Sequence, residues 1–280
     1  MNLKQALAEK KKLTKKQLNL FKGSYDVIGN IAILEIPKEL IKKEKLIAET
    51  VLAQHKQVKT VVKKVGIHHG ELRLQKVKIL AGDKTKETIH TESKTRLKLH
   101  IEKVYFSVRL STERLRIAQQ IKPGERILVM FSGCAPYPCV FAKNSPAKEI
   151  YGVELNKDGH QYGIENIKLN KITNVTLLQG DVRTVVPKLM KTEQPFDRVV
   201  MPLPRDASDF LHVALSAVKD RGMIHFYDFV QEDEFPKASI AKIETACKKA
   251  RCSFNVLNTV KCGSYAPGRF RVCVDFEVVG

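Results

Sequence analysis

The sequence lacks the features that would place a protein in a membrane or outside the cell. No apolar run approaches the length of a membrane span, and the lysine-rich beginning contains no apolar signal-peptide core. The six cysteines include no C-x-x-C pair, so a zinc site is not expected and a reducing compartment is the default. These absences predict a cytoplasmic protein.

Acidic side chains are scarce in the first part of the chain. The 280 residues carry a formal net charge of +19; residues 1–126 hold 29 basic against 13 acidic side chains, whereas residues 127–280 hold 20 against 17. A segregated basic surface indicates a polyanionic partner, because each phosphate neutralised releases counterions. A Lys/Glu-rich proteome is the alternative, but it enriches both signs and would not separate them. The distribution favours a nucleic acid.

The chain, 43% hydrophobic, can bury a sizeable core and predicts one large and one smaller domain. Residues 1–22 contain seven lysines and one glutamate and predict a basic arm or helix. Residues 23–103 predict a small α/β RNA-binding domain, with a helix from residue 37 to about 54 that buries Ile41. Its strands are expected at 31–36, 58–65, 72–80, 87–91 and 95–101.

Residues 104–280 alternate strands with helices after a first helix that ends near residue 120. Strands are expected at 126–131, 149–154, 175–179, 196–201 and 222–229. This alternation predicts a doubly wound parallel sheet. Two further strand-like runs, 254–261 and 271–279, follow one another directly and predict a hairpin. A parallel sheet closed by a hairpin is the arrangement expected of the class I, Rossmann-like fold of S-adenosylmethionine (SAM)-dependent methyltransferases.

The turn after the first of these strands indicates a nucleoside site. Gly133 lets the backbone approach a ligand above the carboxyl end of the strand. Glu154 ends the next strand 21 positions later, close to the spacing at which a carboxylate meets ribose hydroxyls. Asp181 could accept from an adenine amino group, or could merely cap the following helix. The predicted cofactor contacts are Phe131, Ser132, Gly133, Glu154, Leu155, Asp181, Val182 and Pro202.

A proline-rich loop, Met201-Pro-Leu-Pro204, follows the fourth strand. Pro202 and Pro204 would stiffen the loop above the cofactor and leave its carbonyl groups able to accept hydrogen bonds. The alternative is a purely structural, proline-rich start to the next helix.

Five segments, in this order, carry a family resemblance. They are Asp26–Pro37, Val104–Arg114, Met130–Gly133, Met201–Pro204 and Tyr265–Gly268. Over about residues 23–280 the chain resembles the archaeal and eukaryotic tRNA (guanine-N1)-methyltransferases that modify position 37, beside the anticodon. The Arg-Leu-Ser-Thr-Glu-Arg run is the most specific, because general methyltransferases have no equivalent. Many family members carry a further amino-terminal domain, which we expect to be absent here.

The resemblance implies a catalytic set. Guanine N1 carries a proton and is a poor nucleophile until a base removes it, while a donor stabilises the charge that develops on O6. In the family the base is the glutamate of the Thr-Glu-Arg segment, here Glu113, and the O6 partner is an arginine that matches Arg73. Tyr105 would pack near the cofactor and the flipped base, whose extraction costs a few kcal/mol. Pro202 and Pro204 complete the predicted catalytic residues.

Two arginines of the same motif are predicted to bind RNA. Arg109 and Arg114 suit phosphates, or alternatively hold the glutamate. Without the family motif, Glu113 would be interpreted as an ordinary carboxylate stabilised in the first turn of a helix.

Three positions depart from the family pattern. Val129 stands where an acidic residue often precedes Met-Phe, and Cys134-Ala135-Pro136 replaces the second glycine of the first cofactor loop. Pro202 stands where the family often has asparagine, so a backbone carbonyl would have to replace that side chain.

We therefore predict a monomeric enzyme that transfers the methyl group of SAM to N1 of guanine 37 in tRNA. No metal is expected, because the sulfonium already activates the methyl group. One alternative is a wybutosine-pathway enzyme that methylates a tricyclic intermediate or transfers the aminocarboxypropyl group. Another is a non-catalytic RNA-binding protein with a degraded SAM fold. A nicotinamide dehydrogenase is disfavoured, because G-x-G-x-x-G is missing.

Overall fold

The computed structural model describes residues 3–9, 13–21, 23–70, 72–203 and 206–280, apart from the side chains of residues 67–69 and 265. The chain forms two compact units, Met1–Thr91 with Arg96–Val108 and Glu92–Thr95 with Arg109–Gly280. Among the helices of the described residues, none is long and apolar enough to cross a membrane.

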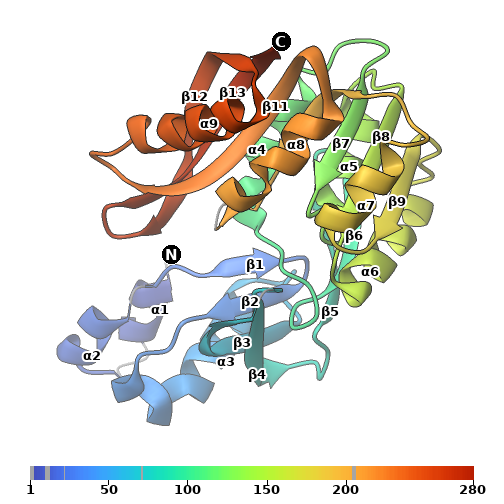
Figure 1. The fold of residues 1–280 in the computed structure, drawn as a ribbon. Coiled ribbons are helices and arrows are strands. Elements are labelled where there is room, and N and C mark those ends of the chain that lie inside the picture. Colours follow the sequence, from blue (N-terminus) through green and yellow to red (C-terminus); the bar gives the residue numbers. More distant parts are fainter. Residues whose placement is uncertain (1–2, 10–12, 22, 71, 204–205) are drawn as a thin grey trace. The chain divides into compact units, whose positions relative to one another are not determined.

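The first unit contains a four-stranded sheet in the order β1-β2-β3-β4 (Figure 1). Strand β2 runs parallel to β3 and antiparallel to β1, and β3 runs antiparallel to β4. Strands β5 and β6 form a separate two-stranded sheet, whose turn belongs to the second unit. The elements are α1 (Leu3–Glu9), α2 (Lys15–Leu20), β1 (Asp26–Ile28), β2 (Ile31–Leu34), the 3₁₀ helix η1 (Lys38–Lys43), α3 (Glu44–Gln54), β3 (Thr60–His69), β4 (Leu74–Gly82), β5 (Glu87–Glu92), β6 (Thr95–His100) and η2 (Val108–Leu110).

The lysine-rich beginning of the chain is part of the core of this unit. Leu3, Leu7, Leu13 and Phe21 are at most 8% exposed and pack in one cluster with apolar residues of α3 and the sheet. Thr14 and Gln17 close a capping box at the start of α2. A separate basic arm or helix was expected here because lysines dominate the composition, yet the sparse leucines fix the two helices to the unit.

The single helix expected from residue 37 is divided in two. Residues 38–43 form the tighter 3₁₀ helix η1, and only then does α3 begin. The tighter turn changes which side chains face inward. Leu40 is fully buried, whereas Ile41 is 49% exposed, so the expected burial of Ile41 was wrong.

The second unit is built on a seven-stranded sheet in the order β12-β13-β11-β10-β7-β8-β9. Strands β7 to β11 are mutually parallel, and β13 lies antiparallel between β11 and β12. The elements are α4 (Ser111–Ala118), β7 (Arg126–Met130), α5 (Pro136–Asn144), β8 (Glu149–Glu154), α6 (Lys157–Leu169), β9 (Val175–Gln179), α7 (Val182–Leu189), β10 (Phe196–Met201), η3 (Ala207–Phe210), α8 (Leu211–Ala217), β11 (Val218–Gln231), α9 (Lys237–Ala250), β12 (Ser253–Ala266) and β13 (Arg269–Val279).

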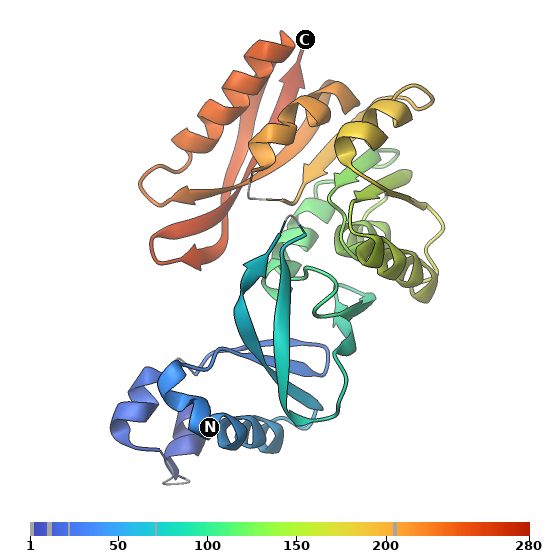
Figure 2. The ribbon, with the colours of Figure 1, turned by 60° about the horizontal axis from the view of Figure 1, so that its bottom comes forward.

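Helices cover both faces of this sheet (Figures 1 and 2). Helices α7, α8 and α9 share one buried cluster with the sheet, and α4 and α5 share another. Because β7 is covered on both faces, it is apolar from Ile127 to Met130 rather than at alternate positions. The predicted α/β fold with a carboxyl-terminal hairpin is confirmed. Since β7 to β10 are parallel neighbours, their carboxyl ends lie along one edge of the sheet, where ligands of such folds bind.

Candidate active site

The loop after β7 has a backbone that few sequences can adopt. Phe131, Gly133 and Ala135 have φ values of 57°, 58° and 62°, in the left-handed region. Glycine occupies that region freely, whereas other residues lose about 1–2 kcal/mol there. Ala135 therefore occupies a backbone conformation suited to the glycine that the family pattern predicts. The amide N–H of Ser132 donates to the Val153 carbonyl (2.9 Å), which attaches the loop to β8.

A second glycine, Gly152 of β8, leaves room for this loop to lie close to the sheet. A Cβ atom on Gly152 of β8 would lie 2.6 Å from Leu177 Cδ2 and 3.1 Å from Ser132 Cβ. A larger side chain would therefore force the loop away from the sheet. The close approach leaves the carboxyl edge of β7 shaped for a ligand that contacts the backbone.

Glu154 ends β8 with its carboxylate against this loop. Its Oε2 accepts from the Gly133 amide N–H (2.6 Å), and its Oε1 accepts from the Asn156 amide N–H (2.8 Å). Burial raises the pKa of Glu154 despite these two hydrogen bonds. A carboxylate has about four acceptor positions. Glu154 therefore retains capacity for ribose hydroxyls, and the arrangement fits a nucleoside cofactor.

The next strand brings Asp181 to the same edge. The amide N–H of Gly180 donates to the Glu154 carbonyl (2.8 Å). Asp181 caps α7 by accepting from the Arg183 amide N–H (2.8 Å), and it pairs with the Arg183 guanidinium. The hydrogen bond from Arg183 lowers the pKa of Asp181. The structure thus shows the capping role, while contact with adenine remains a prediction.

Two other predicted cofactor residues, Leu155 and Val182, follow the ends of β8 and β9. Val182 is 3% exposed and belongs to the core beneath α7. The Leu155 carbonyl accepts from Gln179 Nε2 at 3.3 Å.

The loop after β10 turns sharply at its proline. The Leu203 amide N–H donates to the Met201 carbonyl (2.9 Å), which closes a tight turn around Pro202. Pro204 lies outside the described residues, so its predicted role stays a prediction. Further along, the Phe210 ring packs edge-on against Phe131 at 5.0 Å between centroids, which links this segment to the β7 loop.

Glu113 lies in the first turn of α4 and is 6% exposed. Its Oε2 accepts from Arg116 Nε (2.7 Å), and its Oε1 accepts from Arg116 Nη2 (2.7 Å) and from the Tyr227 hydroxyl (2.6 Å). The Tyr227 oxygen in turn accepts from the Tyr137 hydroxyl (3.2 Å). The carboxylate is therefore held by donors from α4 and β11, and is more than a solvated helix cap.

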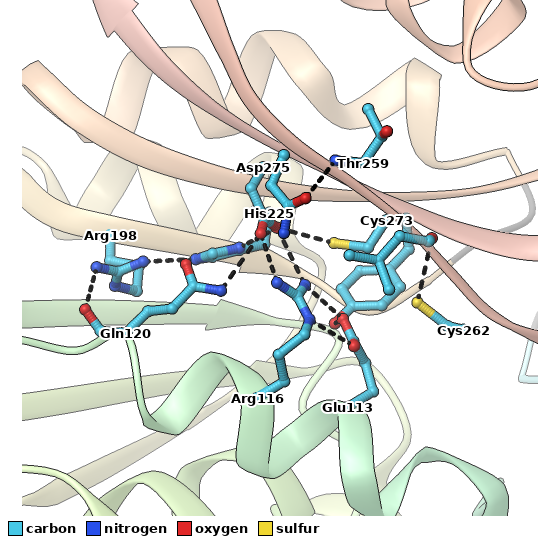
Figure 3. Close-up of polar contacts among 12 residues, drawn as sticks. Glu113, Arg116, Gln120, Arg198, His225, Thr259, Cys262, Cys273 and Asp275 are labelled. Atoms are coloured by element: carbon cyan, nitrogen blue, oxygen red, sulfur yellow. Dashed lines mark hydrogen bonds and ion pairs between the residues drawn. The ribbon is translucent and has the colours of Figure 1, made fainter.

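A buried polar network continues from Arg116 into the sheet (Figure 3). Asp275 Oδ2 accepts from Arg116 Nη1 (2.5 Å), and Asp275 Oδ1 lies 2.6 Å from His225 Nδ1. His225 Nε2 lies 2.6 Å from Arg198 Nη1, and Arg198 pairs with Glu125 at 2.8 Å. Burial lowers the pKa of His225. A neutral ring then donates from Nδ1 to Asp275 and accepts at Nε2 from Arg198.

His225, Cys273 and Asp275 bring three metal-ligand types together, with ligand atoms within 4.8 Å of one another. However, Arg116 and Arg198 direct their guanidinium groups at two of these three residues. A divalent cation there would meet two positive neighbours. Burial would raise the pKa of Asp275, but hydrogen bonds from His225 and Arg116 hold it well below its usual range. The cluster is an ion-pair network of the sheet.

Arg114 does not have the surroundings expected of a phosphate-binding residue. It is 1% exposed, and its Nε and Nη2 donate to the two carboxylate oxygens of Glu92 at 2.5 and 2.6 Å. Its guanidinium also lies 5.8 Å from the centre of the Tyr137 ring. The expectation that Arg114 contacts RNA directly is inconsistent with this burial. Its partner is Glu92, 22 positions earlier.

Two other motif residues meet within the first unit. The Arg73 guanidinium lies 5.4 Å from the centre of the Tyr105 ring, an arrangement in which the ring attracts the cation. Arg73 has a φ of 52°, so its backbone is held in a turn. Arg109, on η2, is exposed and has the access that a phosphate contact requires.

The structure brings together some predicted residues and adds others. The β7 loop, Glu154 and the Asp181 segment share one sheet edge, whereas Arg73 and Tyr105 belong to the first unit. Sequence reasoning missed Tyr227 and Arg116 as partners of Glu113, and Asp275 as the second carboxylate that binds Arg116. Only Arg116 carries a signal, because it stands one helical turn after Glu113.

The strand order, the antiparallel β13 and the carboxyl-edge residues define the class: a class I SAM-dependent methyltransferase fold. A family model described as the TRM5/TYW2 methyltransferase domain matches residues 88–256, and one described as the TYW2 N-terminal domain matches residues 3–85. The chain belongs to the TRM5/TYW2 methyltransferase family, whose members are SAM-dependent tRNA-modifying enzymes. This confirms the resemblance drawn from the five segments.

Relatives in the family differ in the reaction named for them. The chain is 38% identical to the tRNA (guanine(37)-N(1))-methyltransferase Trm5b of Pyrococcus abyssi, over 91% of this chain and 74% of the relative. It is 35% identical to the tRNA 4-demethylwyosine(37)-methyltransferase Taw21 of Saccharolobus solfataricus, over 90% of this chain and 92% of the relative. It is 33% identical to a tRNA(Phe) (4-demethylwyosine(37)-C(7)) aminocarboxypropyltransferase of Methanocaldococcus jannaschii, over 90% of this chain and 96% of the relative.

Solved structures agree with this assignment. The crystal structure of Pyrococcus abyssi Trm5b matches with a TM-score of 0.87 and 37% identity, covering 96% of this chain and 79% of that chain. A structure of aTrm5 in complex with tRNALeu matches with a TM-score of 0.82 and 31% identity, covering 98% of this chain and 77% of that chain.

Proposed function

We propose that the protein is a tRNA (guanine-37-N1)-methyltransferase that uses SAM. The observation that carries this proposal is the buried carboxylate of Glu113 within the complete Ser-Thr-Glu-Arg run. Methylation at N1 needs a base because N1 carries a proton, and a carboxylate oriented by Arg116 is a side chain of the kind that serves as a general base. The identity to Trm5b of Pyrococcus abyssi supports the same reaction.

The cofactor would lie along the carboxyl edge of the sheet. The β7 loop at Gly133 would contact its methionine part, Glu154 its ribose hydroxyls and Asp181 its adenine. Bound SAM supplies a methyl group activated by its sulfonium. The Met201–Leu203 turn follows the adjacent strand β10 at the same edge.

The residues of the chain would carry the proton and the charge. Glu113 takes the proton from guanine N1 as the new N1–methyl bond forms, and S-adenosylhomocysteine is the second product. Arg73 donates to O6, where negative charge accumulates while N1 loses its proton. The Tyr105 ring, which holds the Arg73 guanidinium, offers a face for the flipped base.

The RNA partner is proposed from charge and from the relative. The +16 share of the net charge on residues 1–126 matches the phosphates of a tRNA. The aTrm5 structure contains tRNALeu. Exposed Arg109 is the proposed phosphate contact of the Thr-Glu-Arg motif region.

A second candidate reaction is methylation of 4-demethylwyosine at the same tRNA position. Pro202 favours it, because the family asparagine that could contact the guanine is replaced there by a residue without a polar side chain. A tricyclic base is larger and more apolar than guanine, so a proline suits it better. The similarity to Taw21 points in the same direction.

The test compares two tRNA transcripts that differ only by guanine or adenine at position 37. Methyl-labelled SAM should label the guanine transcript alone, and the label should be recovered as N1-methylguanosine. A tRNA carrying 4-demethylwyosine is assayed in parallel, and SAM labelled in its carboxyl group reports aminocarboxypropyl transfer. Label from the carboxyl group, or methylation of the tricyclic base alone, would overturn the proposal. Absence of SAM binding by calorimetry would favour a non-catalytic RNA-binding protein.

A further inference from the structure

Glu113 is reached by one arginine, one tyrosine and one cysteine. Arg116 offers two parallel N–H groups to the carboxylate, and the Tyr227 hydroxyl donates to the Oε1 oxygen. The Cys262 thiol also hydrogen-bonds to this carboxylate. The carboxylate is thus oriented by side chains from α4, β11 and β12.

Arg116 is shared between two carboxylates. The same guanidinium that holds Glu113 donates from Nη1 to Asp275 Oδ2 (2.5 Å) and from Nη2 to Asp275 Oδ1 (3.1 Å). Asp275 is 1% exposed, and Gln120 Nε2 also donates to it at 3.3 Å. One positive charge therefore stands between two negative ones, in surroundings where water screens little.

Sharing divides the attraction of Arg116 between two carboxylates. Asp275 draws part of the positive charge to itself, so the guanidinium attracts Glu113 less strongly than it would if Glu113 were its single partner. Figure 3 shows Arg116 between the two carboxylates, with His225 on the far side of Asp275.

Other titratable groups face Glu113 from the neighbouring elements of the second unit. Tyr137 of α5 donates to Tyr227, and burial raises the pKa of both hydroxyls. Cys262 of β12 hydrogen-bonds to Glu113 and Cys273 of β13 lies near it, and burial raises the pKa of both thiols and keeps them neutral. Arg116 and Asp275 are therefore the charged groups that set the electrostatics of this carboxylate.

We propose that Tyr227, Arg116 and Asp275 are positioning residues for the Glu113 base: Tyr227 and Arg116 orient its carboxylate, and Asp275 balances the charge of Arg116 so that Glu113 can accept a proton. This inference rests on the proposed function. Helix α4 and strand β13 also gain an ion pair from the contact, so the test must separate positioning from a purely structural tie.

The test uses the pH dependence of single-turnover methyl transfer, with enzyme saturating. Asp275→Asn leaves the Arg116 charge to Glu113 alone, so the acid limb should move to lower pH by about one unit and the plateau rate should fall about tenfold. Tyr227→Phe removes one donor to the anion, so its acid limb should move to higher pH. Asp275→Glu, which keeps the charge, should restore the wild-type limb in part.

Asp197→Asn is the matched control on neighbouring β10. The Asp197 carboxylate bonds to the Arg126 amide N–H (2.7 Å) and pairs with Lys219, so its loss should leave the acid limb unchanged. Opposite shifts in the Asp275 and Tyr227 variants support the inference. Rate losses without a shift would show a structural tie and overturn it.

Two further outcomes are distinguishable. If Asp275→Asn does not fold, Tyr227→Phe decides alone, because an unchanged limb overturns the inference and an upward shift supports it. If the wild-type protein transfers no methyl group to guanine 37, the proposed function fails. The inference fails separately when the wild type is active and the variants share its profile.

Discussion

The buried pair between Arg114 and Glu92 decides whether this motif arginine supports the fold or contacts RNA. The two side chains are 2% and 4% exposed, and they are joined by two hydrogen bonds of 2.5 and 2.6 Å. Glu92→Gln keeps the shape of the side chain and removes its charge. The substitution therefore measures how much the free energy of unfolding falls when the buried Arg114 guanidinium loses the negative charge that neutralises it.

The expected loss of unfolding free energy is about 3 kcal/mol. Removing one partner of a buried ion pair typically costs about 3–5 kcal/mol, and glutamine retains one acceptor for Arg114, which places the loss at the lower end. Replacing both residues by methionine removes both desolvation penalties. The double variant should therefore recover most of the stability that the single variant loses.

Urea unfolding followed by far-ultraviolet circular dichroism measures this loss, since the chain contains no tryptophan. Glu87→Gln on the same strand is the control. Glu87 pairs with Lys98 at 3.2 Å with side chains 41% and 35% exposed, so its loss should cost less than about 1 kcal/mol. A Glu92→Gln loss no larger than the control, combined with weaker tRNA binding by Arg114→Met, would refute the burial argument and return Arg114 to the RNA surface.

Four further predictions concern the site. Glu113→Gln should lower turnover by about 10²–10⁴-fold while calorimetric SAM affinity stays constant, and an equal loss of SAM binding would contradict a role as base. Arg73→Ala should slow the single-turnover step; a normal rate would remove Arg73 from the mechanism. Glu154→Gln should weaken SAM binding about tenfold or more, whereas Glu149→Gln at the other end of β8 should not. Because burial lowers the pKa of His225, the folded protein holds it neutral while the unfolded chain protonates near pH 6.5. Stability should therefore fall as pH drops below about 6.5, by up to about 1.4 kcal/mol per unit, and His225→Gln should show a shallower dependence in denaturant titrations at pH 7.5 and 5.5. Identical slopes would contradict a neutral buried histidine.

The fold was predictable wherever the signal is local. The parallel strands β7 to β10 of the second unit are short runs that end at turn residues, and β7, β8 and β10 were predicted within a residue of their observed bounds, whereas β11 extends beyond the predicted 222–229 at both ends. The hairpin of β12 and β13 was predictable because a turn joins the two runs directly. The division between η1 and α3 was not, since both helix types place apolar residues at similar spacings.

Of the site, only the residues at the carboxyl ends of the strands could be predicted from the sequence. The spacing of Gly133 and Glu154 predicted that both belong to one nucleoside site, and the structure joins them by a hydrogen bond. The partners of the Thr-Glu-Arg segment could not be predicted, because Arg114 pairs with Glu92 and Arg116 with Asp275, residues that are distant along the chain. Arg114 and Arg116, two positions apart on one helix, thus pair with carboxylates from different parts of the chain, and no pattern of sequence spacing predicts which carboxylate each one meets.

The distance along the chain between Arg116 and Asp275, 159 positions, has a consequence for synthesis. A ribosome delivers Glu113 and Arg116 long before it delivers β13, the strand that must insert between β11 and β12. Until then Arg116 lacks its second carboxylate partner. The proposed positioning of Glu113 is therefore complete only when β13, the last strand to be made, lies between β11 and β12.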